Sequence, residues 1–106
     1  MCGIAGWIGL PPEGPNYAER MARALRHRGP DACGIQSWPR ATLVHTRLSI
    51  IDLSPTGAQP MANEVGTVWT VFNGEIYNHH SLRRHLESHG HTFRGRSDTE
   101  TLPHLY

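Results

Sequence analysis

The sequence predicts a single α+β domain in which antiparallel strands pack with flanking helices. Two strand-like runs, Gly34 to Trp38 and Thr42 to Arg47, are separated by a short proline-containing turn and predict a β-hairpin. One helix is predicted to start at Asn16 and stop before Gly29-Pro30, and another to run from His79 to His89. The chain has 106 residues, which is enough for one modest domain, residues 1–106.

The first part of the chain is expected to contain a strand, a loop and the first helix. The strand spans Gly3 to Ile8, and the proline-rich loop spans Leu10 to Pro15. Asn16 is expected to cap the helix, with Glu19 at capping-box spacing. The apolar face of this helix is formed by Tyr17, Ala18, Met21, Ala22 and Leu25.

The turn after this helix, Arg26 to Asp31, is interpreted as a helix stop with a local turn at Asp31.

In the second hairpin strand, alternation places two sets of side chains on opposite faces. Those sets are Leu43, His45 and Arg47 on one face, and Thr42, Val44 and Thr46 on the other. Arg47 falls at the strand end, where side chains commonly enter a site.

The second half of the chain begins with a long loop, Ser54 to Glu64, followed by a strong strand signal at Val68 to Phe72. Bulky residues on both faces predict that this strand is buried on both sides. Asn73-Gly74 reads locally as a tight hairpin turn, with Glu75 to Tyr77 as the return strand.

Three further features are expected near the C-terminal end. Asn78 caps the second helix, Gly90 ends it, and His91 to Arg94 forms a short strand. Ser97 to Glu100 has capping-box spacing and opens a last helix. Pro103 follows within that helix, where it either falls in the tolerated first turn or kinks the helix.

Composition excludes several classes of function. Hydrophobic content is 38%, charged content is 18% and the net charge is +1, which fits a folded chain without an electrostatic case for nucleic acid or an acidic membrane. No apolar run is long enough to span a bilayer, and no secretory leader is evident. The two cysteines, Cys2 and Cys33, are too few for a disulfide framework, which predicts a reducing cytoplasm.

Cys2 directly follows Met1, so removal of Met1 would place a thiol and a free α-amine on one residue. An α-amine titrates close enough to neutral pH to act as a general base, and N-terminal amines activate nucleophiles in this way. Gly3 and Gly6 permit a close approach of the backbone. The alternative is a chance cysteine at the start of a short strand.

The first candidate function is a cysteine hydrolase of amides, built on Cys2 as nucleophile. Asn73 and Gly74 could supply a side-chain amide and a backbone N–H to an oxyanion. Arg47 could grip a carboxylate, and Glu75 and Asp98 could accept hydrogen bonds from an ammonium group. The matching substrate is a free amino acid with a side-chain amide.

Two other classes of function are alternatives to the hydrolase. His85 and His89 lie four residues apart with His91 nearby, which resembles half of a zinc site. No cysteine or carboxylate lies at ligand spacing there, and Arg83 and Arg84 add repelling charge, so we interpret a solvated helix face and predict no metal. An interaction module using the loop from residue 54 to 64 is the remaining alternative.

Six short motifs occur in order along the chain: Met1 to Gly6, Arg26 to Asp31, Arg47 to Leu53, Gln59 to Met61, Asn73 to Asn78 and Ser97 to Glu100. With these motifs the sequence resembles the glutaminase domain of glutamine-dependent asparagine synthetases, which are class II glutamine amidotransferases. The resemblance covers essentially the whole chain and implies the N-terminal-nucleophile hydrolase fold of two stacked antiparallel sheets between helices. Related enzymes that form other amides remain an alternative.

The resemblance implies a role for each matching residue. Cys2 would form a thioester with glutamine, using its own amine as base and then as acid. Asn73 and Gly74 would hold the oxyanion, so the hairpin turn expected there would instead be a turn of the site. The residues that would bind glutamine are Arg47, Leu48, Ser49, Ile50, Ile51, Asn73, Gly74, Glu75 and Asp98.

The resemblance also implies partners and cofactors. Glutaminase domains of this family are longer than 106 residues and precede a synthetase domain, so we expect a truncated chain, active or inactive as a fragment. Glutamine hydrolysis is expected to need no cofactor, whereas ATP and Mg would serve the synthetase domain that makes asparagine from aspartate. A homodimer is compatible with this assignment.

Overall fold

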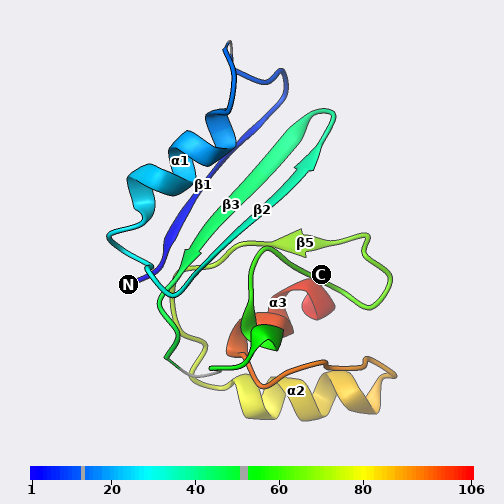
Figure 1. Ribbon diagram of the computed structural model, residues 1–106. Helices are drawn as coiled ribbons and strands as arrows, with labels where there is room; N and C mark the ends of the chain where they lie inside the picture. Colours follow the sequence, from blue (N-terminus) through cyan, green and yellow to red (C-terminus); the bar gives the residue numbers. More distant parts are fainter. Residues whose placement is uncertain (13, 51–52) are drawn as a thin grey trace.

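A three-stranded antiparallel sheet forms the first half of the protein. The computed structural model describes residues 1–12, 14–50 and 53–106. Its strands are β1 (Gly3–Ile8), β2 (Ala32–Trp38) and β3 (Ala41–Arg47), in the order β1-β3-β2 (Figure 1). The predicted first strand and the predicted hairpin are therefore confirmed.

Helix α1 (Tyr17–Leu25) lies against one face of this sheet (Figure 1). Ala18 and Ala22 of the helix form a buried cluster with Val44 of β3, as the predicted apolar face requires. The expected cap at Asn16 is wrong, because Asn16 adopts a left-handed conformation (φ 58°) and its side chain makes no capping hydrogen bond. Its backbone carbonyl accepts the first helical hydrogen bond from Arg20 instead.

The alternation predicted for β3 is confirmed by what each face contacts. Thr46 Oγ1 donates to the carbonyl of Leu25 at 3.1 Å, which joins the strand to the end of α1. His45 and Arg47 lie on the opposite face and line a cavity. The period of two in strand side chains thus separates a core face from a site face.

The second half of the protein starts with a 3-10 helix, η1 (Pro55–Gly57), and a small antiparallel pair, β4 (Met61–Ala62) and β5 (Trp69–Thr70). The strand predicted at 68–72 is longer than the observed one, and its side chains are half-buried rather than enclosed on both faces. Residues 75–77 do not form a return strand, because the amide of Ile76 is taken by the carboxylate of Asp98.

Helix α2 (His79–Ser88) confirms the second predicted helix, and Gly90 ends it with a φ of 92°. Asn78 precedes the helix, but its side chain makes no capping hydrogen bond, so that expectation is wrong. The short strand expected at 91–94 is also absent from the described structure. The amides of Thr92 and Arg94 donate to the carboxylates of Glu64 and Glu100 rather than to a neighbouring strand.

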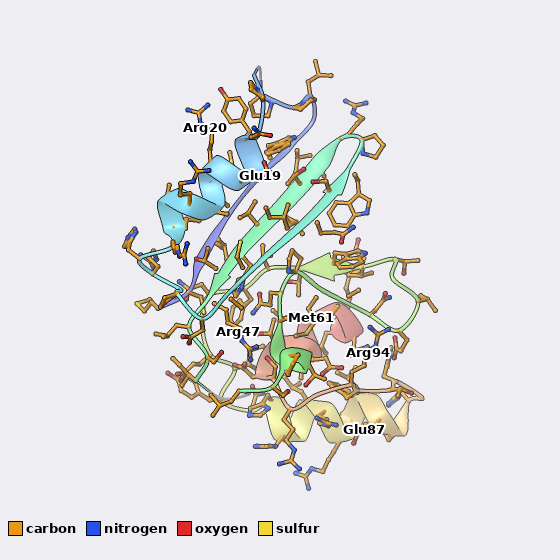
Figure 2. The ribbon with its side chains drawn as sticks, in the orientation of Figure 1. Glu19, Arg20, Arg47, Met61, Glu87 and Arg94 are labelled. Atoms are coloured by element: carbon orange, nitrogen blue, oxygen red, sulfur yellow. The ribbon has the colours of Figure 1, made fainter. Side chains whose placement is uncertain are left out.

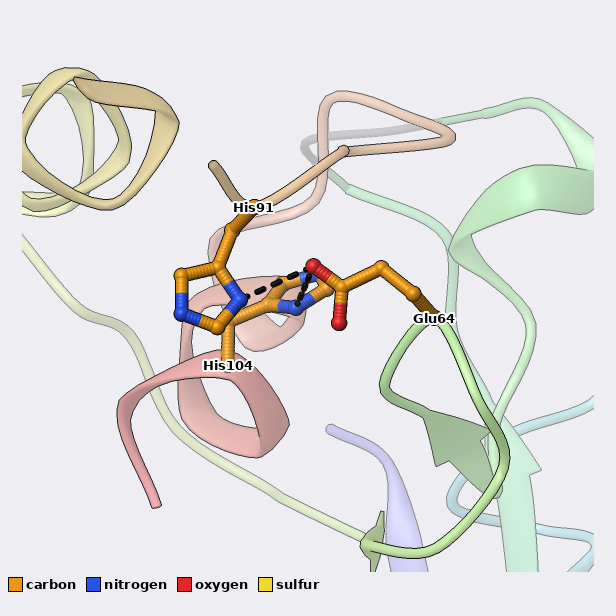
Figure 3. Close-up of side chains that lie close together, drawn as sticks. All are labelled: Glu64, His91 and His104. Carbon is orange, nitrogen blue, oxygen red and sulfur yellow. Dashed lines mark hydrogen bonds and ion pairs between the residues drawn. The ribbon is translucent and has the colours of Figure 1, made fainter. Parts of the chain in front are cut away.

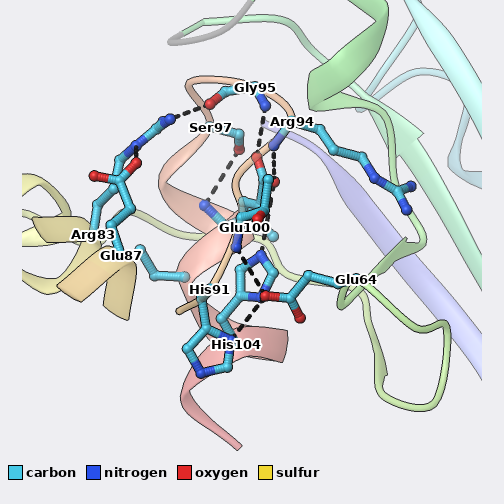
Figure 4. Close-up of polar contacts among 12 residues, drawn as sticks. Glu64, Arg83, Glu87, His91, Arg94, Gly95, Ser97, Glu100 and His104 are labelled. Atoms are coloured by element: carbon cyan, nitrogen blue, oxygen red, sulfur yellow. Dashed lines mark hydrogen bonds and ion pairs between the residues drawn. The ribbon is translucent and has the colours of Figure 1, made fainter. Parts of the chain in front are cut away.

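The last helical segment consists of a 3-10 turn, η2 (Asp98–Glu100), followed directly by α3 (Thr101–Leu105). Ser97 Oγ accepts a hydrogen bond from Thr99 N, so half of the expected capping box is present. The other half is wrong, because the Glu100 carboxylate accepts from the amides of Arg94 and Gly95 (Figure 4). Pro103 lies in the first turn of α3, where its missing N–H leaves no helical hydrogen bond unmade.

Glu64, in the turn after β4, ties this half together. Its Oε1 accepts from the amide of Thr92 at 3.0 Å and from Nδ1 of His91 at 2.8 Å. The pKa of Glu64 is lowered to about 2, first by a hydrogen bond from its own amide and then by Thr92, His91 and nearby His104, against the opposing effect of burial. The carboxylate is therefore ionised throughout the neutral range.

The protein is thus an α+β structure with two antiparallel sheets and packed helices, as the sequence predicts. Within the described residues, no helix is both long enough and apolar enough to cross a bilayer.

Candidate functional site

A cavity of about 200 Å³ lies where the three-stranded sheet meets the second half of the chain. Figure 2 places Arg47 in this region, between the end of β3 and α3. The cavity brings together eight of the predicted site residues from segments far apart in the sequence. They are Cys2, Arg47, Leu48, Ile50, Asn73, Gly74, Glu75 and Asp98.

Cys2 is half-buried and is held beside the end of β3 by Leu48. The amide of Leu48 donates to Sγ at 3.3 Å, and Sγ lies 3.6 Å from the carbonyl of the same residue. Met1 lines the cavity next to Cys2. The thiol therefore faces the cavity with a backbone donor already directed at the sulfur.

The turn from Arg26 to Asp31 supports Cys2 and the adjacent strand. Arg28 Nε donates to the carbonyl of Cys2 at 3.1 Å. Asp31 Oδ2 accepts from the amide of Ser49 at 2.8 Å, so the local turn expected of the Asp31 side chain is replaced by a contact 18 residues away. The residues of this turn predicted only a helix stop, because their hydrogen-bond partners, Cys2 and Ser49, are distant in the chain.

Gly29 explains why this turn can lie so close to β3. A Cβ at Gly29 would lie 2.3 Å from the carbonyl carbon of Thr46 and 2.5 Å from the amide nitrogen of Arg47. A side chain cannot occupy that space, so the backbone approach requires glycine. The amide of Asp31 then donates to the carbonyl of Arg47 at 2.9 Å, which fixes the strand end that carries Arg47.

Arg47 is buried, and its Nη1 donates to the carbonyl of Ser54 at 2.8 Å. A guanidinium carries five N–H donors in a planar fork whose geometry matches a carboxylate. Ser49 is not among the residues that line the cavity, and its amide is used by Asp31. Ile51 lies outside the described residues.

The turn that carries Asn73 and Gly74 is held from two sides. The amide of Phe72 donates to Gln59 Oε1 at 2.6 Å, and the amide of Ile76 donates to Asp98 Oδ2 at 2.7 Å. Gln59 also donates from Nε2 to Thr99 Oγ1 at 3.3 Å, which connects the turn to η2. Hydrogen bonds of the Gln59 and Asp98 side chains therefore fix the turn that carries the oxyanion candidates. The sequence analysis gave Gln59 no role in the site.

Asp98 is buried, and both its oxygens accept backbone hydrogen bonds, from Ile76 and from Thr99 at 2.9 Å. A carboxylate has about four acceptor positions, so it can still accept from a substrate ammonium. Glu75 is exposed at the cavity mouth. One cation and two carboxylates thus border a single small cavity, which suits a zwitterionic amino acid.

His45 is a further cavity residue to which the sequence analysis gave no role. It is 1% exposed, and neither ring nitrogen makes a hydrogen bond of standard geometry with the described residues. Burial lowers the pKa of His45, the Phe72 backbone opposes this effect, and the charge of Arg47 adds to it. A neutral imidazole therefore packs beside Arg47, and strand alternation is the signal that could have placed it there.

The three histidines whose spacing resembles half of a zinc site, His85, His89 and His91, do not come together at one point in the structure. The rings of His85, on α2, and His89, directly after it, lie 4.4 Å apart, and Nδ1 of His89 contacts the carbonyl of His85. His91 instead approaches Glu64 and His104. None of these residues lines the cavity described above.

Comparisons with known proteins agree with the motifs. The family model described as a glutamine amidotransferase domain matches residues 1–106. The chain is 46% identical to asparagine synthetase [glutamine-hydrolyzing] 2 and 44% identical to asparagine synthetase [glutamine-hydrolyzing] 3, both from Arabidopsis thaliana. It is 43% identical to a probable asparagine synthetase [glutamine-hydrolyzing] from Dictyostelium discoideum. All of the chain is matched in each case, and it spans 18–20% of the length of these relatives. The chain belongs to the glutamine amidotransferase domain family.

Proposed function

We propose that this chain hydrolyses glutamine to glutamate and ammonia through a thioester on Cys2. The observation that carries the proposal is the convergence of Cys2, Arg47, Asn73, Gly74 and Asp98 on one cavity. The cavity holds a thiol, a cation, a carboxylate and a candidate oxyanion site in a space that suits a free amino acid. Family membership supports the same chemistry.

Substrate binding uses the charged groups at the cavity wall. Arg47 receives the α-carboxylate, while Asp98 and Glu75 accept hydrogen bonds from the α-ammonium. Leu48 and Ile50, which also line the cavity, complete the binding of glutamine. These contacts direct the side-chain amide of glutamine toward Cys2.

The chemical step requires removal of Met1, which frees the α-amine of Cys2. That amine takes the thiol proton, and the thiolate attacks the amide carbon of glutamine. Asn73 Nδ2 and the amide of Gly74 stabilise the oxyanion, and each such donor contributes roughly 3–4 kcal/mol in hydrolases. The ammonium of Cys2 then protonates the leaving nitrogen, so ammonia departs and a thioester remains.

Water completes the cycle. The Cys2 amine takes a proton from water, the resulting hydroxide attacks the thioester, and the sulfur leaves as a thiolate that regains that proton. The net reaction consumes glutamine and water and releases glutamate and ammonia. Every step uses residues of this chain and needs no metal.

The wider assignment follows from the relatives. We propose that the chain adopts the N-terminal-nucleophile hydrolase fold and supplies ammonia to a C-terminal synthetase domain. That domain would bind ATP and Mg and convert aspartate to asparagine in the cytoplasm. The names of the relatives, which describe glutamine-hydrolysing asparagine synthetases, support this proposal.

Intact mass spectrometry of the purified protein, before and after exposure to an electrophilic glutamine analogue, tests the proposal. We expect loss of the Met1 mass, followed by one adduct whose formation excess glutamine blocks. Cys2→Ala should prevent the adduct. Cys33→Ala is the matched control, because Cys33 is the second thiol, is exposed on β2, and does not line the cavity.

Two results would contradict the mechanism. An adduct that persists in Cys2→Ala, or that is lost in Cys33→Ala, would move the nucleophile away from Cys2. A processed protein that stays unlabelled would show that Cys2 does not react as a nucleophile in this protein.

A further inference from the structure

A second polar cluster lies away from the cavity and joins three separate segments of the chain. Glu64 comes from the turn after β4, His91 from the segment after α2, and His104 from α3 (Figure 3). One ligand atom from each residue lies within 4.8 Å of the other two. None of the three residues lines the candidate glutamine site.

Two of the three ligand separations within this cluster are slightly shorter than those between ligands of one small cation. Nδ1 of His91 lies 2.8 Å, and Nδ1 of His104 lies 3.1 Å, from the same Glu64 oxygen. Ligands bound tetrahedrally to zinc at about 2.0–2.2 Å lie about 3.3–3.6 Å from one another. These two nitrogen–oxygen separations would open by about 0.2–0.8 Å to admit an ion.

His104 supplies the second, independent observation. Its side chain is 1% exposed, and neither ring nitrogen makes a hydrogen bond of standard geometry with the described residues. Each ring nitrogen lies near a carboxylate instead, Nδ1 at 3.1 Å from Glu64 and Nε2 at 3.8 Å from Glu100, without completing a hydrogen bond. An ion bound between Nδ1 and Glu64 would complete the bonding of both atoms.

The surroundings of His104 also suit a ligand. Its Nε2 lies 3.8 Å from Oε1 of Glu100, and Glu100 is fixed by the amides of Arg94 and Gly95 (Figure 4). Metal-bound histidines commonly direct their second nitrogen at such a carboxylate, which fixes the ring and its tautomer. Glu64 and His91 are partly exposed, with side chains 29% and 34% accessible, so an ion can enter from solvent.

We propose that Glu64, His91 and His104 bind a divalent transition metal of the zinc class. Two imidazoles and one carboxylate are a known zinc ligand set, with water in the fourth position. Binding of the ion at Nδ1 of His91 would place the ring proton of that residue on Nε2. The ion would cross-link the β4–β5 turn, the segment after α2, and α3, so its role is to stabilise the second half of the protein.

Titration of the chelator-treated protein with Zn²⁺ tests this proposal, with the visible absorption of bound Co²⁺ as a second readout. We expect saturation at one ion per chain, a tetrahedral cobalt spectrum, and a higher melting temperature with zinc. Glu64→Gln and His91→Ala should each weaken binding by at least about 10–100-fold, the range found even for losses of outer-sphere partners. Glu64→Gln keeps an oxygen that can accept from Thr92, so its fold should survive.

The double variant His85→Ala/His89→Ala is the matched control. These exposed histidines on α2 have the spacing of an ordinary surface chelate, and removing them should leave the affinity unchanged. Equal loss of binding in this control, or no saturable binding in the unaltered protein, would overturn the proposal. Labelling of Cys2 should be unaffected by Glu64→Gln, so failure of this site is distinguishable from failure of the glutaminase.

Discussion

At the scale of single residues, the site depends on a histidine kept neutral beside an arginine. His45 and Arg47 are both buried and lie on the same face of β3. Burial and the Arg47 charge both lower the pKa of His45, so protonation of the imidazole is less favourable in the folded chain than in the unfolded one. This difference makes stability depend on pH.

We expect His45 to contribute stability fully above its unfolded pKa of about 6.5 and to lose it as pH falls through its lower folded pKa. Urea midpoints at about pH 7.5 and about pH 5.5 measure the effect. The unaltered protein should lose more stability between these values than His45→Gln, in which the other histidines are unchanged. Equal losses of stability in the two proteins would show that the fold does not lower the pKa of His45.

At the scale of elements, the side chain of Gln59 holds the turn after β5 in place. Gln59 accepts from the amide of Phe72 and donates to Thr99, so one side chain joins the candidate oxyanion turn to η2. Gly34 of β2 permits this arrangement, because a Cβ there would lie 1.9 Å from the carbonyl oxygen of Gln59. Sheet, turn and 3-10 helix are thus positioned through one residue that does not itself react.

Gln59→Ala should slow labelling of Cys2 by roughly 10–100-fold, because small misplacements of catalytic groups have effects of this size. Gln59→Glu retains an acceptor for Phe72 and should lie between this variant and the unaltered protein. Rates of adduct formation by mass spectrometry give the comparison. The control is Gln36→Ala, which lies on β2 and outside the cavity. Equal labelling rates for Gln59→Ala and Gln36→Ala would contradict the positioning role of Gln59.

At the scale of the whole molecule, the core between α1 and the sheet is small. Its buried members are Ala18, Ala22 and Val44, and the partly buried Ala5, Trp7 and Met21 pack around them. Few large apolar side chains contribute to this cluster. Each methyl group in it therefore accounts for a large share of the stabilisation by burial.

Val44→Ala should lower the free energy of unfolding by about 2 kcal/mol, since Val44 is 0% exposed and the change leaves a cavity. Val65→Ala removes the same atoms from a residue that is 76% exposed and should change stability by less than about 0.5 kcal/mol. Denaturant unfolding of both variants provides the measurement. Similar values for the two would place the core elsewhere.

Much of the fold could be predicted because it depends on local pattern. The strand from Gly3 to Ile8, the hairpin of β2 and β3, and helices α1 and α2 all follow from side-chain period and turn residues. Predicted caps at Asn16 and Asn78 failed because a side chain that can cap a helix need not adopt the required backbone conformation. The predictions of strands at 75–77 and 91–94 were wrong because backbone amides in these segments donate to distant carboxylates instead of to a neighbouring strand.

By itself, the sequence determined the α+β class, the motifs of the glutamine amidotransferase domain family, and the candidate residues from Cys2 to Asp98. These features lie in composition, local period and short ordered motifs, all of which can be read along the chain. Only the tertiary structure decided which residues support the site, such as Arg28, His45 and Gln59, and which histidines meet Glu64. These contacts join residues far apart in sequence, so they depend on how the sheet, the turns and α3 come together.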